Sequence, residues 1–234
     1  MKSMQKKLCL LLMMVLTVTL LTGCGGPVAM NKAKVDDYIL FGHYEQDNNL
    51  DNGKEAIEWL VLDKVDDNTG TYLLLISKYA LDCKPFNETR KNGTYGFCSL
   101  RRWLNNEFLN AAFTSEEQEI IPVADVYTYD NPDYRTEAGY FTYNQVFLLD
   151  LRDVDEYFYP SKKSVCSPTE YAKSQGVYVN DYNHCCWWLS TPGFENEYAA
   201  VVLWEGGGHA TGSAVDNDEN GVRPAIWVKV PEQP

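Results

Sequence analysis

Short runs that alternate apolar and polar residues fill the first third of the chain, and this pattern is typical of half-buried β-strands. The runs cover residues 38–42, 57–65 and 71–77. They are separated by Asn52-Gly53 and by the polar residues 66–70, which tolerate the backbone conformations of tight turns. The pattern therefore predicts three antiparallel strands joined as a meander.

The spacing of apolar residues changes at Ser99, a residue that can cap the first turn of a helix. From there they recur at helical intervals, which predicts an amphipathic helix of about three turns. These residues are Leu100, Trp103, Leu104, Phe108 and Leu109. A second, short helix is indicated after Thr114 or Ser115, where Glu117 and Glu119 follow.

The middle of the chain mixes loop, strand and helix signals. Residues 127–143 are rich in turn-forming and aromatic residues and predict a long surface loop. The apolar run 145–151 predicts a buried strand. In residues 167–176, Ser167 as cap, Pro168 at the first position, Glu170 and a closing Gly176 predict a compact helix.

Helical signals end near Tyr182. Apolar runs at residues 187–190, 198–204, 209–215 and 222–230, separated by Gly-rich and Asp/Asn-rich turns, predict a strand-only C-terminal third. The order strands, helices, strands favours an α+β fold over a wound parallel sheet, and its first and last strands can share one sheet.

The N-terminus has the composition of an export signal. Lys2, Lys6 and Lys7 precede an apolar run over residues 8–21, which is shorter than the roughly 20 residues of a membrane-spanning helix. The following Leu-Leu-Thr-Gly-Cys resembles the bacterial lipoprotein box, which implies cleavage before Cys24 and acylation of its sulfur. We therefore expect a signal peptide over residues 1–23, a tether over 24–36 and one globular domain over 37–231, anchored to the outer face of the cell membrane.

The net negative charge of the chain limits the classes of partner that it can bind. Cleavage removes three lysines and no acidic residue, which takes the formal net charge from −13 to −16. Nucleic acid is excluded as a partner, because phosphates require clustered Lys and Arg. Anionic headgroups would also repel such a chain, so the membrane is a partner through the lipid on Cys24 and not through the protein surface.

Five cysteines follow Cys24, and an exported chain permits disulfides. Cys83 and Cys98 flank the Asn92-Gly93 turn and are a plausible pair; Cys166 with Cys185 or Cys186 is the other. An odd count leaves one thiol free. Which cysteines pair is left open by the sequence.

His184, Cys185 and Cys186 stand beside Trp187 and Trp188, which raises the question of a metal or catalytic site. Successive side chains of a strand point to opposite faces, so these groups would diverge, which argues against zinc. We expect a core strand with one Trp and one Cys buried and the other Trp supporting a loop or ligand. The expected core also includes Trp59, Trp103 and Trp227, and Arg223 bound to backbone carbonyls or a buried carboxylate.

No cofactor motif is found, and calcium is the remaining candidate. Residues 216–221 begin like an EF-hand loop, but its twelfth position is Trp227 instead of Glu. Residues 47–58 also depart from the EF-hand pattern, because Asn52 stands at the sixth position, where that loop has a glycine. Both stretches fit hairpin turns, although Asp216, Asp218 and Asn220 could be surface calcium ligands.

Three segments together resemble a known family. The first segment contains FGHYEQDN and NGKEAIEWLVLD. The second is CSLRRWLNNEFLNAAF, and the third contains CWWLSTPG, YAAVV and GVRPAIWVKV. They are similar to a widespread family of secreted and lipid-anchored bacterial proteins classed as a domain of unknown function, which usually has Trp-Leu-Arg-Ser-Pro-Gly where this chain has residues 188–193. The ending is also similar to the C-type-lectin-like fold of formylglycine-generating enzymes and phage-type variable binding proteins, which implies an α+β, lectin-like domain.

The hypothesis that follows is a lipid-anchored, extracytoplasmic binding or adhesion module whose ligand is a glycan or another envelope component. Its expected ligand contacts are Tyr127, Tyr129, Tyr134, Trp204, Asp216 and Asp218. One alternative is an enzyme of the formylglycine-generating type or a cell-wall hydrolase, although the three histidines accompany no nucleophile motif. The other alternative is a purely structural envelope lipoprotein.

Overall fold

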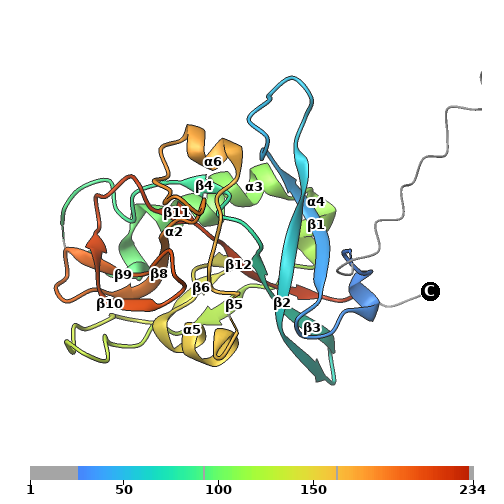
Figure 1. Ribbon diagram of the computed structural model, residues 1–234. Coiled ribbons are helices and arrows are strands. Elements are labelled where there is room, and N and C mark those ends of the chain that lie inside the picture. The colour runs from blue at the N-terminus through green and yellow to red at the C-terminus, as the bar shows by residue number, and fades with distance from the viewer. Residues whose placement is uncertain (1–25, 92, 162, 232–234) are drawn as a thin grey trace, which may run out of the picture.

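The computed structural model describes residues 26–91, 93–161 and 163–231. The predicted signal peptide and the predicted lipid-bearing Cys24 lie outside the described residues. Within them the chain is α+β and rich in antiparallel strands, with two five-stranded sheets at opposite ends of the molecule in Figure 1 and short helices beside them.

The first sheet joins the two ends of the described chain. Its strand order is β1-β2-β3-β12-β7, all antiparallel. The meander predicted from the alternating pattern forms β1 (Tyr38–Tyr44), β2 (Glu55–Asp67) and β3 (Gly70–Ser77). The last strand, β12 (Ala225–Lys229), pairs with β3, and β7 (Val146–Phe147) pairs with its other edge.

The second sheet has the order β10-β9-β8-β11-β4. Its strands are β4 (Asp82–Cys83), β8 (Trp187–Pro192), β9 (Tyr198–Val202), β10 (Gly208–Ala214) and β11 (Gly221–Val222). The predicted single strand over 222–230 is wrong, because it divides at Arg223-Pro224 into β11 and β12, which belong to different sheets. Proline has no N–H for a strand ladder, so the chain passes from one sheet to the other there, as Figure 1 shows.

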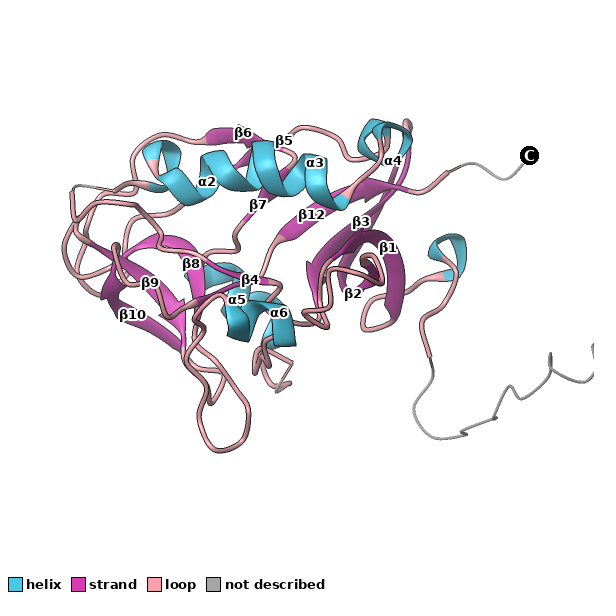
Figure 2. Ribbon diagram, turned by 90° about the horizontal axis from the view of Figure 1, so that it is seen from above, coloured by secondary structure: helices cyan, strands magenta, loops and turns pink. Residues whose placement is uncertain are grey.

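The amphipathic pattern beginning at Ser99 forms three consecutive helical segments along both sheets in Figure 2. They are α2 (Ser99–Trp103), the π-helical η3 (Leu104–Phe108) and α3 (Leu109–Ala112). The expected cap shifts by one residue, because the Cys98 sulfur, not Ser99, accepts the backbone N–H of Arg101 at 3.3 Å. Next comes α4 (Ser115–Glu119), capped by Thr114 with a capping box to Glu117.

Two predictions in the middle of the chain need correction. The run 145–151 is not one strand, because β7 ends at Phe147 and α5 (Leu151–Phe158) begins four residues later. The side chains of Asp150 and Asp153 form a capping box that starts this helix. In α6 (Glu170–Ser174) the cap is Thr169 and not Ser167, because the Thr169 hydroxyl accepts the N–H of Ala172.

The remaining elements are small. The 3₁₀ turns η1 (Met30–Lys32) and η2 (Tyr95–Phe97) precede the first sheet and the long helical run. The loop predicted over 127–143 connects β5 (Ala124–Val126) to β6 (Thr142–Asn144), and these two strands form an antiparallel ribbon beside α5 in Figure 1. In the described part of the chain, no helix has the length and apolar character needed to cross a membrane.

The adjacent indoles of β8 lie in the core. We expected one of them to face a loop or ligand, yet Trp187 and Trp188 are both fully buried. Strand β8 lies inside its sheet and is covered on both faces, so alternation sends the rings into two different parts of the core. Trp187 packs against Phe158 of α5, and Trp188 packs against Phe86. Each indole N–H donates to a backbone carbonyl.

Candidate ligand cleft

A cleft of about 190 Å³ lies where β5, α5 and the first sheet meet. Its wall from the sheet comprises Leu74 of β3, Phe147 of β7 and Trp227 of β12. β5 and the loop after it contribute Ala124, Asp125, Val126, Tyr127 and Tyr129. Leu149 and, from α5, Asp153 and Tyr157 complete the lining.

One face of helix α5 packs into the core, and another face lines the cleft. Leu151, Val154 and Phe158 are buried, and the helix contacts β8 and β10 of the second sheet. Asp153 and Tyr157 are one helical turn apart and therefore lie on one face of the helix, which lines the cleft. The helix thus fixes a carboxyl and a phenol in the cleft by packing its other side into the core.

The Asp153 carboxyl is held by the start of its own helix. Its Oδ2 accepts the Asp150 N–H at 2.8 Å, while Asp150 Oδ1 accepts the Asp153 N–H at 2.9 Å. The other oxygen of Asp153, Oδ1, has no hydrogen-bond partner among the described residues. In the same part of the chain no Lys or Arg lies within ion-pair distance of this carboxyl.

Burial makes these carboxyls weaker acids. Desolvation, with a further contribution from the Asp150 charge, raises the pKa of Asp153 to about 7. Burial also raises the pKa of Asp150, although the backbone N–H groups of Asp153, Arg152 and Tyr129 partly offset it. The pKa of the Tyr157 phenol is raised by burial and then by the Asp153 charge. The cleft therefore contains a carboxyl that changes its charge near neutral pH.

An aromatic surface continues outward from the cleft. The ring of Tyr127 lies 5.6 Å from that of Phe141, which lies 5.4 Å from that of Tyr143, and all three are exposed. We call these three residues the aromatic row. Nearby, the Arg152 guanidinium lies over the Tyr129 ring, 3.6 Å from its centroid. The rings of the aromatic row are thus exposed to a ligand, whereas the Tyr129 ring is already in contact with the Arg152 guanidinium.

The six expected ligand contacts do not lie together in the structure. Tyr127 and Tyr129 line the cleft, whereas Tyr134 donates or accepts a 2.9 Å hydrogen bond with Thr211 on β10 and packs against Phe194. Trp204 is exposed in the turn between β9 and β10.

The calcium candidates lie in the loop between β10 and β11. Asp216 and Asp218 are exposed, and Asn220 is buried. Within the described ranges, neither aspartate belongs to a group of three His, Cys, Asp or Glu side chains close enough to share a metal ion.

The expected ligand contacts did not include the cleft residues Asp125, Asp153, Tyr157 and Trp227. Asp153 and Tyr157 follow the apolar run 145–151, in a stretch for which the sequence pattern predicts no element. The spacing Asp150-x-x-Asp153 is a capping signature and was the available signal. Trp227 was expected in the core, but its ring is only partly buried and forms a wall of the cleft. The likewise partly buried Trp103 packs on Phe108 instead.

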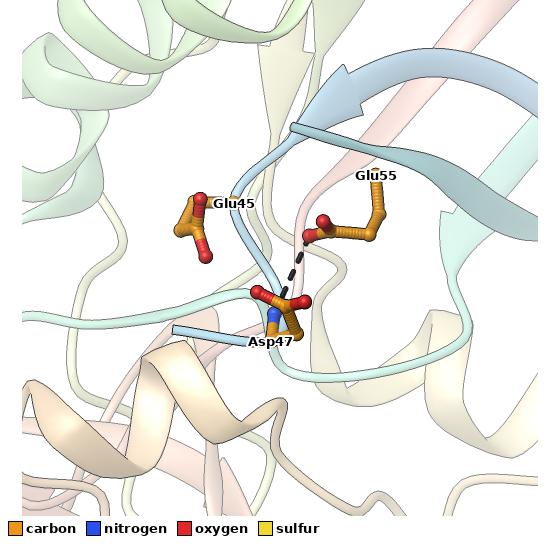
Figure 3. A group of neighbouring side chains, drawn as sticks. All are labelled: Glu45, Asp47 and Glu55. Carbon is orange, nitrogen blue, oxygen red and sulfur yellow. Dashed lines mark hydrogen bonds between the residues drawn. The ribbon is translucent and has the colours of Figure 1, made fainter. Parts of the chain in front are cut away.

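A group of three acids that could hold a metal ion lies elsewhere, in the β1–β2 hairpin. Figure 3 shows Glu45, Asp47 and Glu55 facing one another. Glu55 accepts the N–H groups of Gln46 and Asp47, and Glu45 accepts that of Asn49. These bonds account for the close approach of the carboxylates, which close the hairpin loop.

The five described cysteines are free thiols, so neither predicted disulfide is found. The thiols of Cys83 and Cys98 have separate partners: Cys83 donates to the Asp218 carbonyl at 2.9 Å, and Cys98 caps α2. Cys166 and Cys185 are neighbours across an isolated bridge and are both buried, whereas Cys186 is only partly buried.

Arg223 is buried at the junction of the sheets and donates to the carbonyls of Ser77, Lys163 and Ser164. Its guanidinium also lies over the rings of Trp187 and Phe158. These contacts give Arg223 a structural role in joining the two sheets.

One protein family matches this chain. Its sequence model, described as a domain of unknown function (DUF6273), covers residues 70–230, so the chain belongs to that family. Every residue that lines the cleft falls inside this range, whereas the acidic hairpin of β1 and β2 lies before it. No curated protein and no solved structure matches the chain.

Proposed function

We propose that this member of the DUF6273 family is a lipid-anchored, extracytoplasmic binding module that holds a glycan or another envelope component in the cleft between β5 and α5. The observation that carries the proposal is the lining itself, in which Tyr127, Tyr129 and Trp227 surround one carboxyl. Aromatic walls with a few fixed polar groups are typical of ligand sites on rigid scaffolds.

The proposal includes the location of the protein, which is the outer face of the cell membrane. The basic start, the apolar run and the box ending at Cys24 support export followed by acylation, and the described domain then begins within a short tether of the membrane. Labelling with a radioactive or clickable fatty acid tests this directly. Wild type should take up label, and Cys24→Ser should not.

A C-type-lectin-like arrangement is the fold that we propose for the domain. It is supported by the shared sheet of the first and last strands and by the separate strand-rich unit of β8 to β11. An experimental structure compared with lectin-like domains tests it.

A convergent pair of cysteines or carboxylates in a deep pocket would favour an enzyme. Cys166 and Cys185 do converge, but both are fully buried, and neither lines the cleft. Asp150 and Asp153 are close, but they bind each other's backbone as a helix cap. The arrangement therefore supports binding better than catalysis.

The test is binding of the purified full chain to a glycan array and to cell-wall fractions, with and without calcium. Tyr129→Ala should weaken binding at least tenfold, because a stacking surface of the cleft is lost. Tyr140→Ala is the matched control, since Tyr140 is an exposed aromatic of the same loop outside the cleft lining. If no fraction binds at all, the proposal fails and a structural envelope lipoprotein becomes the better description.

A further inference from the structure

We infer that the group bound in the cleft is an organic cation, an amine or alkylated ammonium carried by a larger ligand. The inference rests on the proposed function, because it names the chemistry of the same site. It follows from the charges, the aromatic faces and the size of the cleft.

Negative charges outnumber positive ones around the cleft. Asp125 and Asp153 line it. The charges of Asp63, Asp150 and Glu156 also act on the Tyr157 phenol in its wall. The positive charge of Arg152 acts on Asp150, and its guanidinium lies over the Tyr129 ring. A positively charged ligand would offset this imbalance, and an anion would increase it.

The aromatic walls suit a cation as well. The rings of Tyr127, Tyr129, Tyr157 and Trp227 contribute to the lining. The faces of such rings are electron-rich and attract ammonium and guanidinium groups, most strongly when these are desolvated. Arg152 on Tyr129 shows this interaction at the site itself, with 3.6 Å between the guanidinium carbon and the ring centroid. An ammonium group inside the cleft would meet ring faces and the free oxygen of Asp153.

The size of the cleft indicates how much of the ligand enters. A volume of about 190 Å³ is below the roughly 300–1,000 Å³ of pockets that enclose whole small molecules. The cleft therefore fits a head group, and the rest of the ligand would extend over the exposed aromatic row of Tyr127, Phe141 and Tyr143. A neutral sugar could stack on the same rings, but it would leave the carboxylates without a countercharge.

The first experiment compares two probes of nearly the same shape. Choline is titrated into the full chain, and 3,3-dimethyl-1-butanol, its neutral isostere, is titrated in parallel, with Trp fluorescence and calorimetry as readouts. We expect choline to bind at least tenfold more tightly than the isostere. Equal affinity of the two probes, or equal competition by sodium or calcium ions, overturns the inference.

The second experiment removes the charge. Asp153→Asn should weaken choline binding at least tenfold and leave the isostere unchanged, because an amide keeps the shape of the carboxyl. Asp155→Asn is the control, since Asp155 is exposed on the same helix and does not line the cleft. Equal loss in both variants would indicate a long-range effect of net charge and would also contradict the inference.

A pH profile of the unmodified chain keeps the test valid if Asp153→Asn does not fold. The groups that act on the cleft are Asp63, Asp125, Asp150, Arg152, Asp153, Glu156 and Tyr157. Since the pKa of Asp153 is about 7, choline affinity should rise up to about tenfold between pH 6 and pH 8. A flat profile contradicts the inference. Cleft-dependent binding of a neutral saccharide without any response to choline would do the same and would leave the proposed function intact.

Discussion

Cys166 and Cys185 face each other across an isolated antiparallel bridge, and the Cys185 N–H donates to the Cys166 carbonyl at 2.9 Å. Both thiols are fully buried. Burial raises the pKa of Cys166, but the hydrogen bond from the Cys185 thiol and the positive Arg223 outweigh it, so the pKa of Cys166 is lowered. The pKa of Cys185 is raised by the same hydrogen bond and by burial. Residues paired across an antiparallel bridge have Cα atoms about 4.5–5.5 Å apart, which lies within the range that a disulfide spans.

We predict that mild oxidation with diamide during refolding joins Cys166 to Cys185. Each thiol loses one hydrogen, and diamide is reduced to its hydrazine form. Peptide mapping without reductant should find this crosslink, and the oxidised chain should gain about 3 kcal/mol in its free energy of unfolding. Cys166→Ser should abolish the crosslink, while Cys83→Ser, a change at a thiol with another partner, should leave it intact. A Cys185–Cys186 or Cys83–Cys98 crosslink instead would contradict the prediction.

Replacing the buried arginine should weaken the junction of the sheets. Arg223→Lys cannot reproduce the planar contacts to the Ser77 and Ser164 carbonyls, and it leaves buried acceptors without partners. We expect the free energy of unfolding in urea to fall by about 2–4 kcal/mol. Arg102→Lys on the exposed surface of α2 is the control and should change it by less than about 0.5 kcal/mol. Similar effects of both changes would rule out a special role for Arg223.

The stability of the protein should fall as the pH rises from about 4 to about 7. Burial and the Asp150 charge raise the pKa of Asp153 from 3.8 to about 7, so the folded chain retains a proton that the unfolded chain has released. In that interval the unfolded state binds fewer protons, and increasing pH favours it. The shift sets an upper limit of about 4 kcal/mol, which solvent in the cleft will reduce. Urea unfolding at pH 5 and pH 8 measures the difference, which should shrink in Asp153→Asn and persist in Asp155→Asn.

Gly212 should be intolerant of any side chain. It has a φ of +79° at the irregularity between β9 and β10, and an added Cβ would lie 2.3 Å from the Ala199 carbonyl oxygen. Gly212→Ala should therefore cost at least about 2 kcal/mol in thermal or urea unfolding. Gly207→Ala in the neighbouring turn is the matched control, because nothing lies within 4 Å of a Cβ there. A tolerated Gly212→Ala would show that the strand pair adjusts.

Local elements with strong patterns could be predicted from the amino-acid sequence alone. The alternating runs of the first meander and the helical spacing after Ser99 specify burial of one face, and that requirement is local. The α+β class and membership of a domain-of-unknown-function family were also predicted in this way and are confirmed. Export and lipid attachment at Cys24 stay predictions, because their residues lie outside the described ranges.

How distant segments meet could be seen only in the folded chain. An apolar run such as 145–151 suits a strand or a buried helix equally well, and in the structure it divides into β7, a short connection and the first residue of α5. The same packing brought Tyr127 and Trp227, 100 residues apart, to one cleft and placed Tyr134 against another sheet. Nothing in a single strand or loop specifies these neighbours, because they depend on which faces of different elements are buried together.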